Sequence, residues 1–337
     1  TFSSYPDPLL PSEDFGLFSD LLNIHLGAAS RMYEMPAGQF VQMCTAMAYE
    51  VSSGRDWHAS QYNESQGIEW NDGMYGFEIR ASSQYGQVPE VDIFWSTGAS
   101  CTVYKKHYDE LSGVYMRTGR NLPSQLLGRM FNMVQRYDTV NYIRIQHQPV
   151  LPTRLFKTLS DLFGAYHECY ASPLNRHYDA YCSPFPDTDV PFGSSGSFYD
   201  FYPTNGSFVC HPPPVQQDIL QMYAHIVHLL TSTDQPMSFF VFTPTMDTVD
   251  PLRDPSVAPY VVHSTVIQRG CHIMTLGTQF RTSNSAQVPL RETIYLSNND
   301  SSMVWLQNAA GRVQWPVTED KVSAVISATL PTNGGLH

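Results

Sequence analysis

The chain has 337 residues, a net charge of −12 and 42% hydrophobic residues. This length and composition allow two domains, or one large domain with a helical extension, around a substantial core. No apolar run reaches the roughly twenty residues of a membrane-spanning helix, and the first residues lack the basic and apolar zones of a signal peptide. We therefore expect neither feature, and the acidic balance argues against nucleic-acid binding by the whole surface.

The six cysteines are scattered along the chain, without a Cys-x-x-Cys pair. This spacing favours buried free thiols in a reducing compartment over a zinc ribbon or a disulfide framework. His225 and His228 are three residues apart, but the sequence places no carboxylate or thiolate beside them. We therefore predict no metal site.

Positive charge is concentrated in residues 101–157, where nine Lys or Arg residues stand against three acidic residues. Two interpretations are open. The stretch forms a local phosphate-binding face on an acidic body, or it is a solvated helix surface whose charges pair with acidic neighbours. The candidates for contact with RNA phosphates are Lys105, Lys106, Arg117, Arg120, Arg129 and Arg136.

Residues 1–150 predict a mainly helical, partly irregular domain. Apolar residues at three- and four-residue spacing predict helices at residues 15–32, 40–51 and Leu122–Tyr137. Residues 52–96 are rich in Gly, Asn, Ser and Asp, which indicates loops with short strands at Tyr75–Arg80 and Val91–Trp95.

Residues 151–337 predict short apolar strands that alternate with helices, a pattern typical of a mostly parallel α/β sheet. Helices are expected at Pro152–Phe163, ending at Gly164, and at Gln216–Leu230. Strands are expected at Ala165–Ala171, Phe208–Cys210, Phe239–Thr243, Val261–Val266, His272–Leu276 and Met303–Gln307. Ligands of such sheets bind at the carboxyl ends of the strands, where two corners follow, Ser172–Asn175 and His211–Pro214.

The corner His211–Pro214 reads His-Pro-Pro-Pro and follows a short apolar strand directly. Enzymes that methylate amino groups on nucleic-acid bases have a polar-Pro-Pro-aromatic tetrad at such a corner. The polar side chain and a proline carbonyl localise the lone pair of the amine, the aromatic ring stacks on the flipped-out base, and the prolines keep the corner rigid. Here His211 replaces the usual Asn or Asp, and Pro214 replaces the aromatic residue.

The sequence from His167 to Pro244 resembles the methyltransferase domain of the phosphorylated-CTD-interacting factor family. The resemblance rests on blocks in the family's order and spacing, at Glu168–Asn175, Tyr181–Asp189, Phe192–Phe201, Gly206–Phe208 and Pro236–Phe242. Weaker similarity extends back to Leu122 and forward to Trp315-Pro316.

The resemblance implies a Rossmann-like class I S-adenosylmethionine-dependent methyltransferase domain at residues 151–337, preceded by the mainly helical domain at residues 1–150. It implies methyl transfer from S-adenosylmethionine to the exocyclic amine of the 2′-O-methyladenosine next to the mRNA cap. Implied partners are capped RNA that starts with adenosine, and a protein partner or RNA polymerase II-associated machinery, in the nucleus. The family's WW domain, which reads phosphorylated polymerase tails, is not expected within these residues.

The resemblance also implies two sets of site residues. The cofactor set is Glu168, Ser172, Pro173, Leu174, Asn175, Asp200 and Phe201. The catalytic set is His211, Pro212, Pro213 and Pro214, where the family has Asn-Pro-Pro-Phe.

His211 can still make one hydrogen bond, but Pro214 has no π face. Loss of stacking and alignment would cost on the order of three decades in rate. Two hypotheses therefore stay open: a cap-adenosine methyltransferase whose tetrad impairs or abolishes activity, and a catalytically inactive scaffold subunit that binds RNA or a protein.

Overall fold

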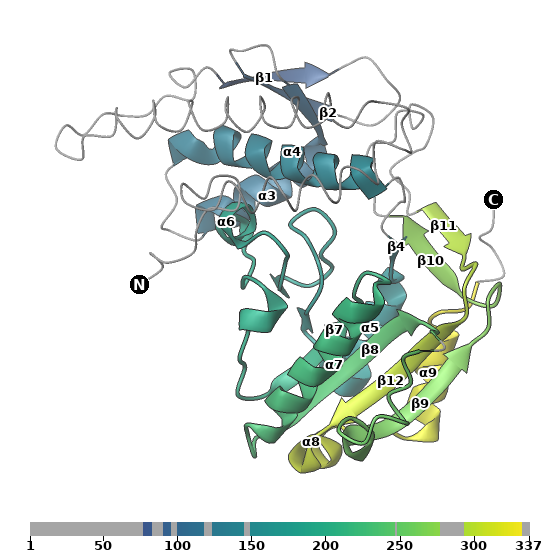
Figure 1. The fold of residues 1–337 in the computed structure, drawn as a ribbon. Helices are drawn as coiled ribbons and strands as arrows, with labels where there is room; N and C mark the ends of the chain where they lie inside the picture. Colours follow the sequence, from purple (N-terminus) through teal and green to yellow (C-terminus); the bar gives the residue numbers. More distant parts are fainter. Residues whose placement is uncertain are drawn as a thin grey trace, which may run out of the picture. The chain divides into compact units, whose positions relative to one another are not determined.

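A computed structural model of the chain describes residues 77–82, 90–95, 100–117, 123–144, 149–246, 248–276 and 293–331 (Figure 1). These residues belong to one structural unit, residues 71–337. The helices expected at residues 15–32 and 40–51, and the candidate Arg120, lie outside the described residues.

The largest sheet has six strands in the order β6-β5-β7-β8-β12-β9. The first four run parallel to one another, whereas β12 pairs antiparallel with both β8 and β9. The sheet is therefore mixed, and the fold is mixed α/β. The strands are β5 (His167–Glu168), β6 (Ala180–Tyr181), β7 (Gly206–Cys210), β8 (Met237–Pro244), β9 (Val261–Ile267) and β12 (Ser301–Gln307).

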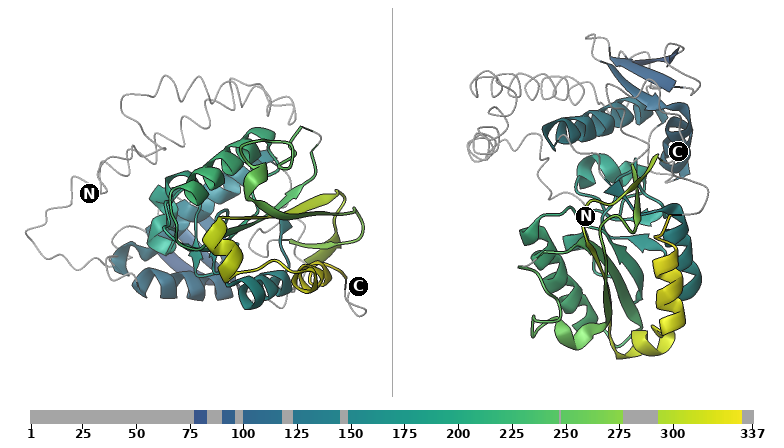
Figure 2. Two further views of the ribbon diagram at one scale, coloured as in Figure 1. Left: turned by 90° about the horizontal axis from the view of Figure 1, so that it is seen from below. Right: turned by 90° about the vertical axis from the view of Figure 1, so that its right-hand side faces the viewer.

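Helices cover both faces of this sheet because its strands are apolar on both sides. On one face, Phe239 and Val241 pack with α7 (Gln216–Thr231). On the other face, Phe240 and Phe242 pack with α5 (Thr153–Phe163) and α9 (Glu319–Ser327). Figure 2 shows the sheet between these two layers.

The two longest predicted helices of this region are confirmed as α5 and α7. In α5 the apolar side chains recur every three or four residues, and Gly164 ends the helix in the left-handed conformation, with φ 64°. A further short helix, α8 (Ala309–Gln314), follows β12 and is capped by the Asn308 side chain, which accepts from Gly311 N at 2.8 Å.

Three antiparallel strands precede the basic helices: β1 (Phe77–Ser82), β2 (Glu90–Trp95) and β3 (Ser100–Tyr104). The predicted strands at Tyr75–Arg80 and Val91–Trp95 are thus confirmed, whereas β3 was not expected. The helices that follow are α3 (Lys105–Arg117), α4 (Leu126–Arg144) and the short 3₁₀ helix η2 (Pro123–Gln125). Their shared core includes Leu174 and Phe192 from the later part of the chain, so it packs directly on the loops around β6.

A second small sheet joins distant segments in the order β11-β10-β4. Its strands are β4 (Pro149–Val150), β10 (Ile273–Leu276) and β11 (Thr293–Leu296). The remaining short helices are α6 (Pro186–Asp189), η3 (Val190–Phe192), η4 (Phe198–Asp200) and η5 (Ala258–Tyr260). Within the described ranges, no helix is both long enough and apolar enough to cross a membrane. The described cysteines are free thiols, of which only Cys271 is exposed.

The packing of α8 on β8 depends on the lack of a side chain at Gly311. A Cβ atom there would overlap the carbonyl oxygen of Met237, which is backbone and cannot rotate away. We expect Gly311→Ala to lower the free energy of unfolding by about 1–3 kcal/mol, measured by urea denaturation.

Gly113→Ala in α3 is the matched control, because its nearest neighbour, Arg117 Nη1, would lie 4.0 Å from the new Cβ. This variant should gain about 0.5–1 kcal/mol from helix propensity. Equal stability of the two variants would contradict the close contact at Gly311.

Candidate functional site

The two predicted corners leave the same edge of the sheet. β5 pairs in parallel with β6 on one side and with β7 on the other. The connection that leaves β5 therefore leads toward one edge of the sheet, to β6, and the connection that leaves β7 leads toward the other, to β8. Such a switch point opens a crevice at the carboxyl ends of the strands. His211 follows β7 directly, and Ser172 comes four residues after the end of β5. The strand pairing therefore places the predicted cofactor loop and the tetrad after the carboxyl ends of the neighbouring strands β5 and β7, although no tetrad residue lines the cavity described below.

The loop after β5 is closed on itself by Ser172 and Asn175. The Asn175 side-chain oxygen accepts from Ser172 N at 2.7 Å and from Ser172 Oγ at 3.0 Å, and Asn175 N donates to Ser172 Oγ at 3.1 Å. Between them, Pro173 and Leu174 are buried. The turn is thus rigid, and Leu174 anchors it in the core of α3 and α4.

Glu168 holds the segment that follows this turn. Its buried Oε1 accepts from His177 N at 2.5 Å and from Tyr178 N at 2.8 Å. Burial raises the pKa of the Glu168 carboxyl to about 7, against the lowering effect of these two N–H donors and of Arg176. Glu168 therefore fixes the backbone of the loop after β5 at His177 and Tyr178.

Asp200 and Phe201 lie apart from this loop. Asp200 is exposed. The Phe201 ring stacks on His167 with centroids 4.4 Å apart, and its carbonyl accepts from His225 Nε2 at 3.2 Å. Of the predicted cofactor residues, Pro173, Leu174 and Asn175 line a cavity, Glu168 and Ser172 shape its loop, and Asp200 and Phe201 are not in its wall.

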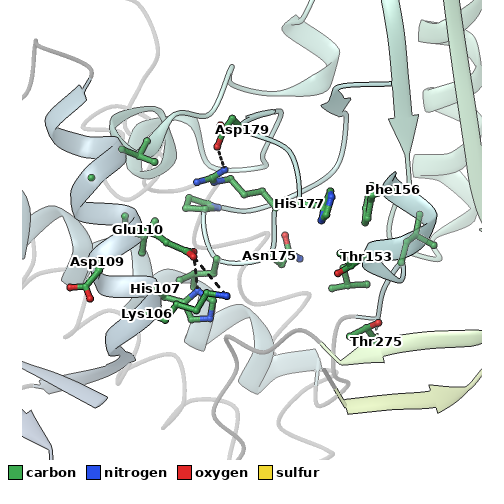
Figure 3. Close-up of a pocket in the computed structure, with 18 of the residues that line it drawn as sticks. Lys106, His107, Asp109, Glu110, Thr153, Phe156, Asn175, His177, Asp179 and Thr275 are labelled. Atoms are coloured by element: carbon green, nitrogen blue, oxygen red, sulfur yellow. Dashed lines mark hydrogen bonds and ion pairs between the residues drawn. The ribbon is translucent and has the colours of Figure 1, made fainter. Parts of the chain in front are cut away.

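The cavity has a volume of about 560 Å³ and lies between α3, the loop after β5, the start of α5 and β10 (Figure 3). Three buried polar atoms of its wall residues have no hydrogen-bond partner among the described residues: His107 Nε2, Arg176 Nε and Thr275 Oγ1. A stacked pair, Phe156 and His177, forms part of the wall, with centroids 4.7 Å apart. Unsatisfied buried donors beside an aromatic surface are typical of a ligand site.

His107 and Thr275 were not foreseen as site residues. His107 is half-buried on α3, and desolvation lowers the pKa of its imidazole. Thr275 lies in β10, next to Val150 of β4. The sequence predicted that strand but carried no signal that it would lie beside the loop after β5.

At the tetrad, the hydrogen bonding of His211 fixes its tautomer. Nδ1 lies 3.0 Å from the carbonyl oxygen of Phe242, and a carbonyl can only accept, so Nδ1 carries the hydrogen. In the neutral ring Nε2 is then an acceptor. Pro212 is buried, whereas Pro213 and Pro214 are exposed. The tetrad therefore offers an acceptor on a rigid corner, without a stacking ring of its own.

The predicted phosphate contacts differ in their surroundings. Lys105 pairs with Asp109 at 2.6 Å, and Lys106 lies 3.9 Å from Glu110. These pairs fit the second interpretation of the basic stretch, a solvated helix surface. Arg117 and Arg129 are exposed, and Arg129 also donates to Gln125.

Arg136 is buried in an ion pair, with 8% of its side chain exposed and Nη1 2.6 Å from Asp187. Next to it, Tyr137 donates to the buried Asp189 at 2.6 Å. These two contacts join α4 to α6 on the segment after β6, so Arg136 holds these two helices together.

Comparisons with known proteins show the family to which this chain is related. The family model described as "Phosphorylated CTD interacting factor 1 WW domain" matches residues 108–277, which include the loop after β5 and the tetrad. Relatives from Mus musculus and Homo sapiens, both named mRNA (2′-O-methyladenosine-N(6)-)-methyltransferase, are each 28% identical. The matches cover 76% and 78% of this chain, but 38% and 39% of the relatives. The chain thus spans about two fifths of the length of these relatives.

The raised pKa of Glu168 predicts a pH-dependent stability. The pKa rises from the usual 4.5 to about 7, so the protonated carboxyl favours folding and this contribution is lost as pH rises through 7. Glu168→Gln keeps an oxygen for the two N–H donors but cannot ionise. We expect its stability relative to the native protein to increase between pH 5 and pH 8, by at most roughly 3 kcal/mol in urea unfolding. A constant difference between the two proteins over this range would contradict the prediction.

Proposed function

This chain belongs to the phosphorylated CTD interacting factor 1 family, and on that premise we propose that it is a methyltransferase module for the exocyclic amine of cap-adjacent 2′-O-methyladenosine. The observation that supports this most is the meeting of two corners, Ser172–Asn175 and His211–Pro214, at the switch point of the sheet. We further propose that its catalysis is impaired by the diverged tetrad.

We propose a Rossmann-like class I fold for residues 151–337, preceded by a mainly helical, partly irregular domain at residues 1–150, whose part from residue 71 onward belongs to the same structural unit as the later residues. The order of the six strands supports the first part. Four parallel strands are followed by β12, which runs antiparallel between β8 and β9. Residues 77–82, 90–95 and 100–104 form strands, so the described part of the first domain is less helical than expected.

S-adenosylmethionine would supply the methyl group, and the residues present fit a molecule of this kind. The cavity of about 560 Å³ is large enough for a nucleoside with an amino-acid tail. Its wall combines buried polar atoms that have no partner among the described residues with the stacked Phe156 and His177. Pro173, Leu174 and Asn175 would contact the cofactor, and Glu168 would keep their loop in place.

His211 and Pro212 would orient the adenine amine. Nε2 of His211 would accept a hydrogen bond from one N–H of the amine, and the Pro212 carbonyl oxygen would accept a hydrogen bond from the other. Both interactions draw the lone pair of the nitrogen away from the ring and toward the methyl donor. No general base is needed, since the proton can leave to water after the transfer.

Pro214 supports an impaired rate rather than an unchanged one. It is exposed and cannot stack on adenine, and stacking contributes about 1–3 kcal/mol per base. The same observation supports the second candidate, an inactive scaffold that binds RNA or a protein partner. We propose capped RNA that starts with adenosine as the partner in either case, with RNA polymerase II-associated machinery as a further candidate, and the nucleus as the location.

The tetrad can be tested with radiolabelled S-adenosylmethionine and capped RNA that begins with adenosine. We expect slow methylation by the native protein. Pro214→Phe should increase kcat/KM for this RNA about tenfold or more, because it restores the stacking ring that helps to bind the base, and His211→Ala should abolish transfer.

Uncapped RNA and capped RNA that begins with guanosine serve as controls. If the native protein and Pro214→Phe both bind S-adenosylhomocysteine yet neither transfers a methyl group, the scaffold function replaces the enzyme function.

RNA affinity can be tested at Arg117 and Arg129, the exposed arginines of the basic helices. Their joint replacement by Ala should weaken binding of capped RNA and reduce the slope of log affinity against log salt by about 0.7 for each lost phosphate contact. Arg253→Ala is the control, because Arg253 is an equally exposed arginine in a segment without predicted RNA contacts. An unchanged salt slope in the double variant would exclude these two arginines as phosphate contacts.

A further inference from the structure

Arg176 differs from the other cations in the cavity wall. Lys106 and Arg117 are exposed at the surface of α3, whereas the Arg176 side chain is 13% exposed. Its guanidinium lies over the ring of Tyr181, 5.7 Å from the centroid. Nη1 donates to the carbonyl oxygen of Tyr178 at 3.2 Å and to Asp179 at 2.8 Å. The group is therefore held in one orientation before any ligand binds.

The Nε side of this guanidinium lies opposite the Nη1 group that makes these hydrogen bonds. Nε is buried and has no hydrogen-bond partner among the described residues, although Nη1 has two. The Nε–H and the adjacent Nη2–H groups of an arginine form a fork that matches the two oxygens of a carboxylate. A buried donor without a partner is unfavourable, so the wall is poised to receive an acceptor at this position.

The charges around the cavity indicate which acceptor fits. The wall contains three basic side chains and three acidic ones, of which Glu110 and Asp179 are labelled in Figure 3; the six are Lys106, Arg117, Arg176, Asp109, Glu110 and Asp179. This balance of charge suits a zwitterion, whose ammonium group the carboxylates can attract while Arg176 takes its carboxylate. An amino-acid tail carries these two groups on one carbon atom.

On this basis we propose that Arg176 binds the α-carboxylate of S-adenosylmethionine and thereby orients its amino-acid end in the cavity. The inference rests on the proposed function, because it assumes that the loop Ser172–Asn175, which Arg176 directly follows, holds that cofactor. None of the residues predicted from the sequence is assigned to this α-carboxylate, so the role of Arg176 is new.

The test compares two ligands by isothermal titration calorimetry. S-adenosylhomocysteine has the amino-acid end, and 5′-methylthioadenosine has the same thioether nucleoside without it. Arg176→Met should weaken S-adenosylhomocysteine about ten- to hundredfold but change 5′-methylthioadenosine by less than about twofold. Arg176→Lys, which keeps the charge but loses the fork, should give an intermediate loss for the first ligand only.

Arg253→Met is the matched control, because it removes one positive charge from an arginine that is 88% exposed and outside the wall. It should leave both affinities unchanged. Equal losses of both ligands in Arg176→Met would assign a purely structural role to Arg176 and overturn the inference, as would unchanged affinities. In both cases the proposed function would stand. If the native protein binds neither ligand, the cofactor assignment of the proposed function fails and the inference falls with it.

Discussion

The hydrogen bonds of Glu168 are the constraint on which the site depends. Parallel neighbours such as β5 and β6 need a crossover, which is usually a helix that positions itself through its own hydrogen bonds. Here residues 169–179 contain only turns. The crossover is fixed instead by Glu168, which binds two of its backbone N–H groups, and by Tyr178, whose hydroxyl donates to the Phe156 carbonyl at 2.7 Å. Without a crossover helix, this edge of the sheet has room for a cavity.

A second set of contacts ties this edge to the helices that precede it. Asp189 is fully buried and accepts from Tyr137, and burial raises the pKa of its carboxyl to about 6. Asp187 pairs with Arg136 from the same turn of α4. An acid that is removed from water in this way is stabilised only by its partners, so α4 and the segment after β6 must keep their relative positions. The basic stretch therefore serves the site partly through structure rather than through contact with RNA.

The sequence predicted those elements whose signal is local. Apolar spacing located α5, α7, β7 and β8 to within a few residues, and resemblance located the two corners. The sequence did not predict contacts between residues that are far apart along the chain. The strand expected at Ala165–Ala171 is only His167–Glu168, because pairing with β6 and β7 ends where the loop turns away. Arg136 and its ion-pair partner Asp187 are 51 positions apart in the sequence. Thr275 lies in the cavity wall, and its strand β10 pairs there with β4, at Val150. No local pattern encodes such contacts.

The divergence of the tetrad affects two functions that are physically separable. The side-chain amide of Asn offers both a donor and an acceptor, whereas His211 has its donor engaged with Phe242 and offers an acceptor at Nε2. In the proposed reaction, alignment of the amine needs an acceptor, and Nε2 of His211 would take this role. Stacking holds the base equally well before and during transfer, so its loss at Pro214 weakens binding of the base more than it changes the chemistry of the bound complex. The exposed corner Pro213–Pro214 therefore lacks the aromatic ring that Asn-Pro-Pro-Phe would place there, and the proposed loss of function follows from this difference.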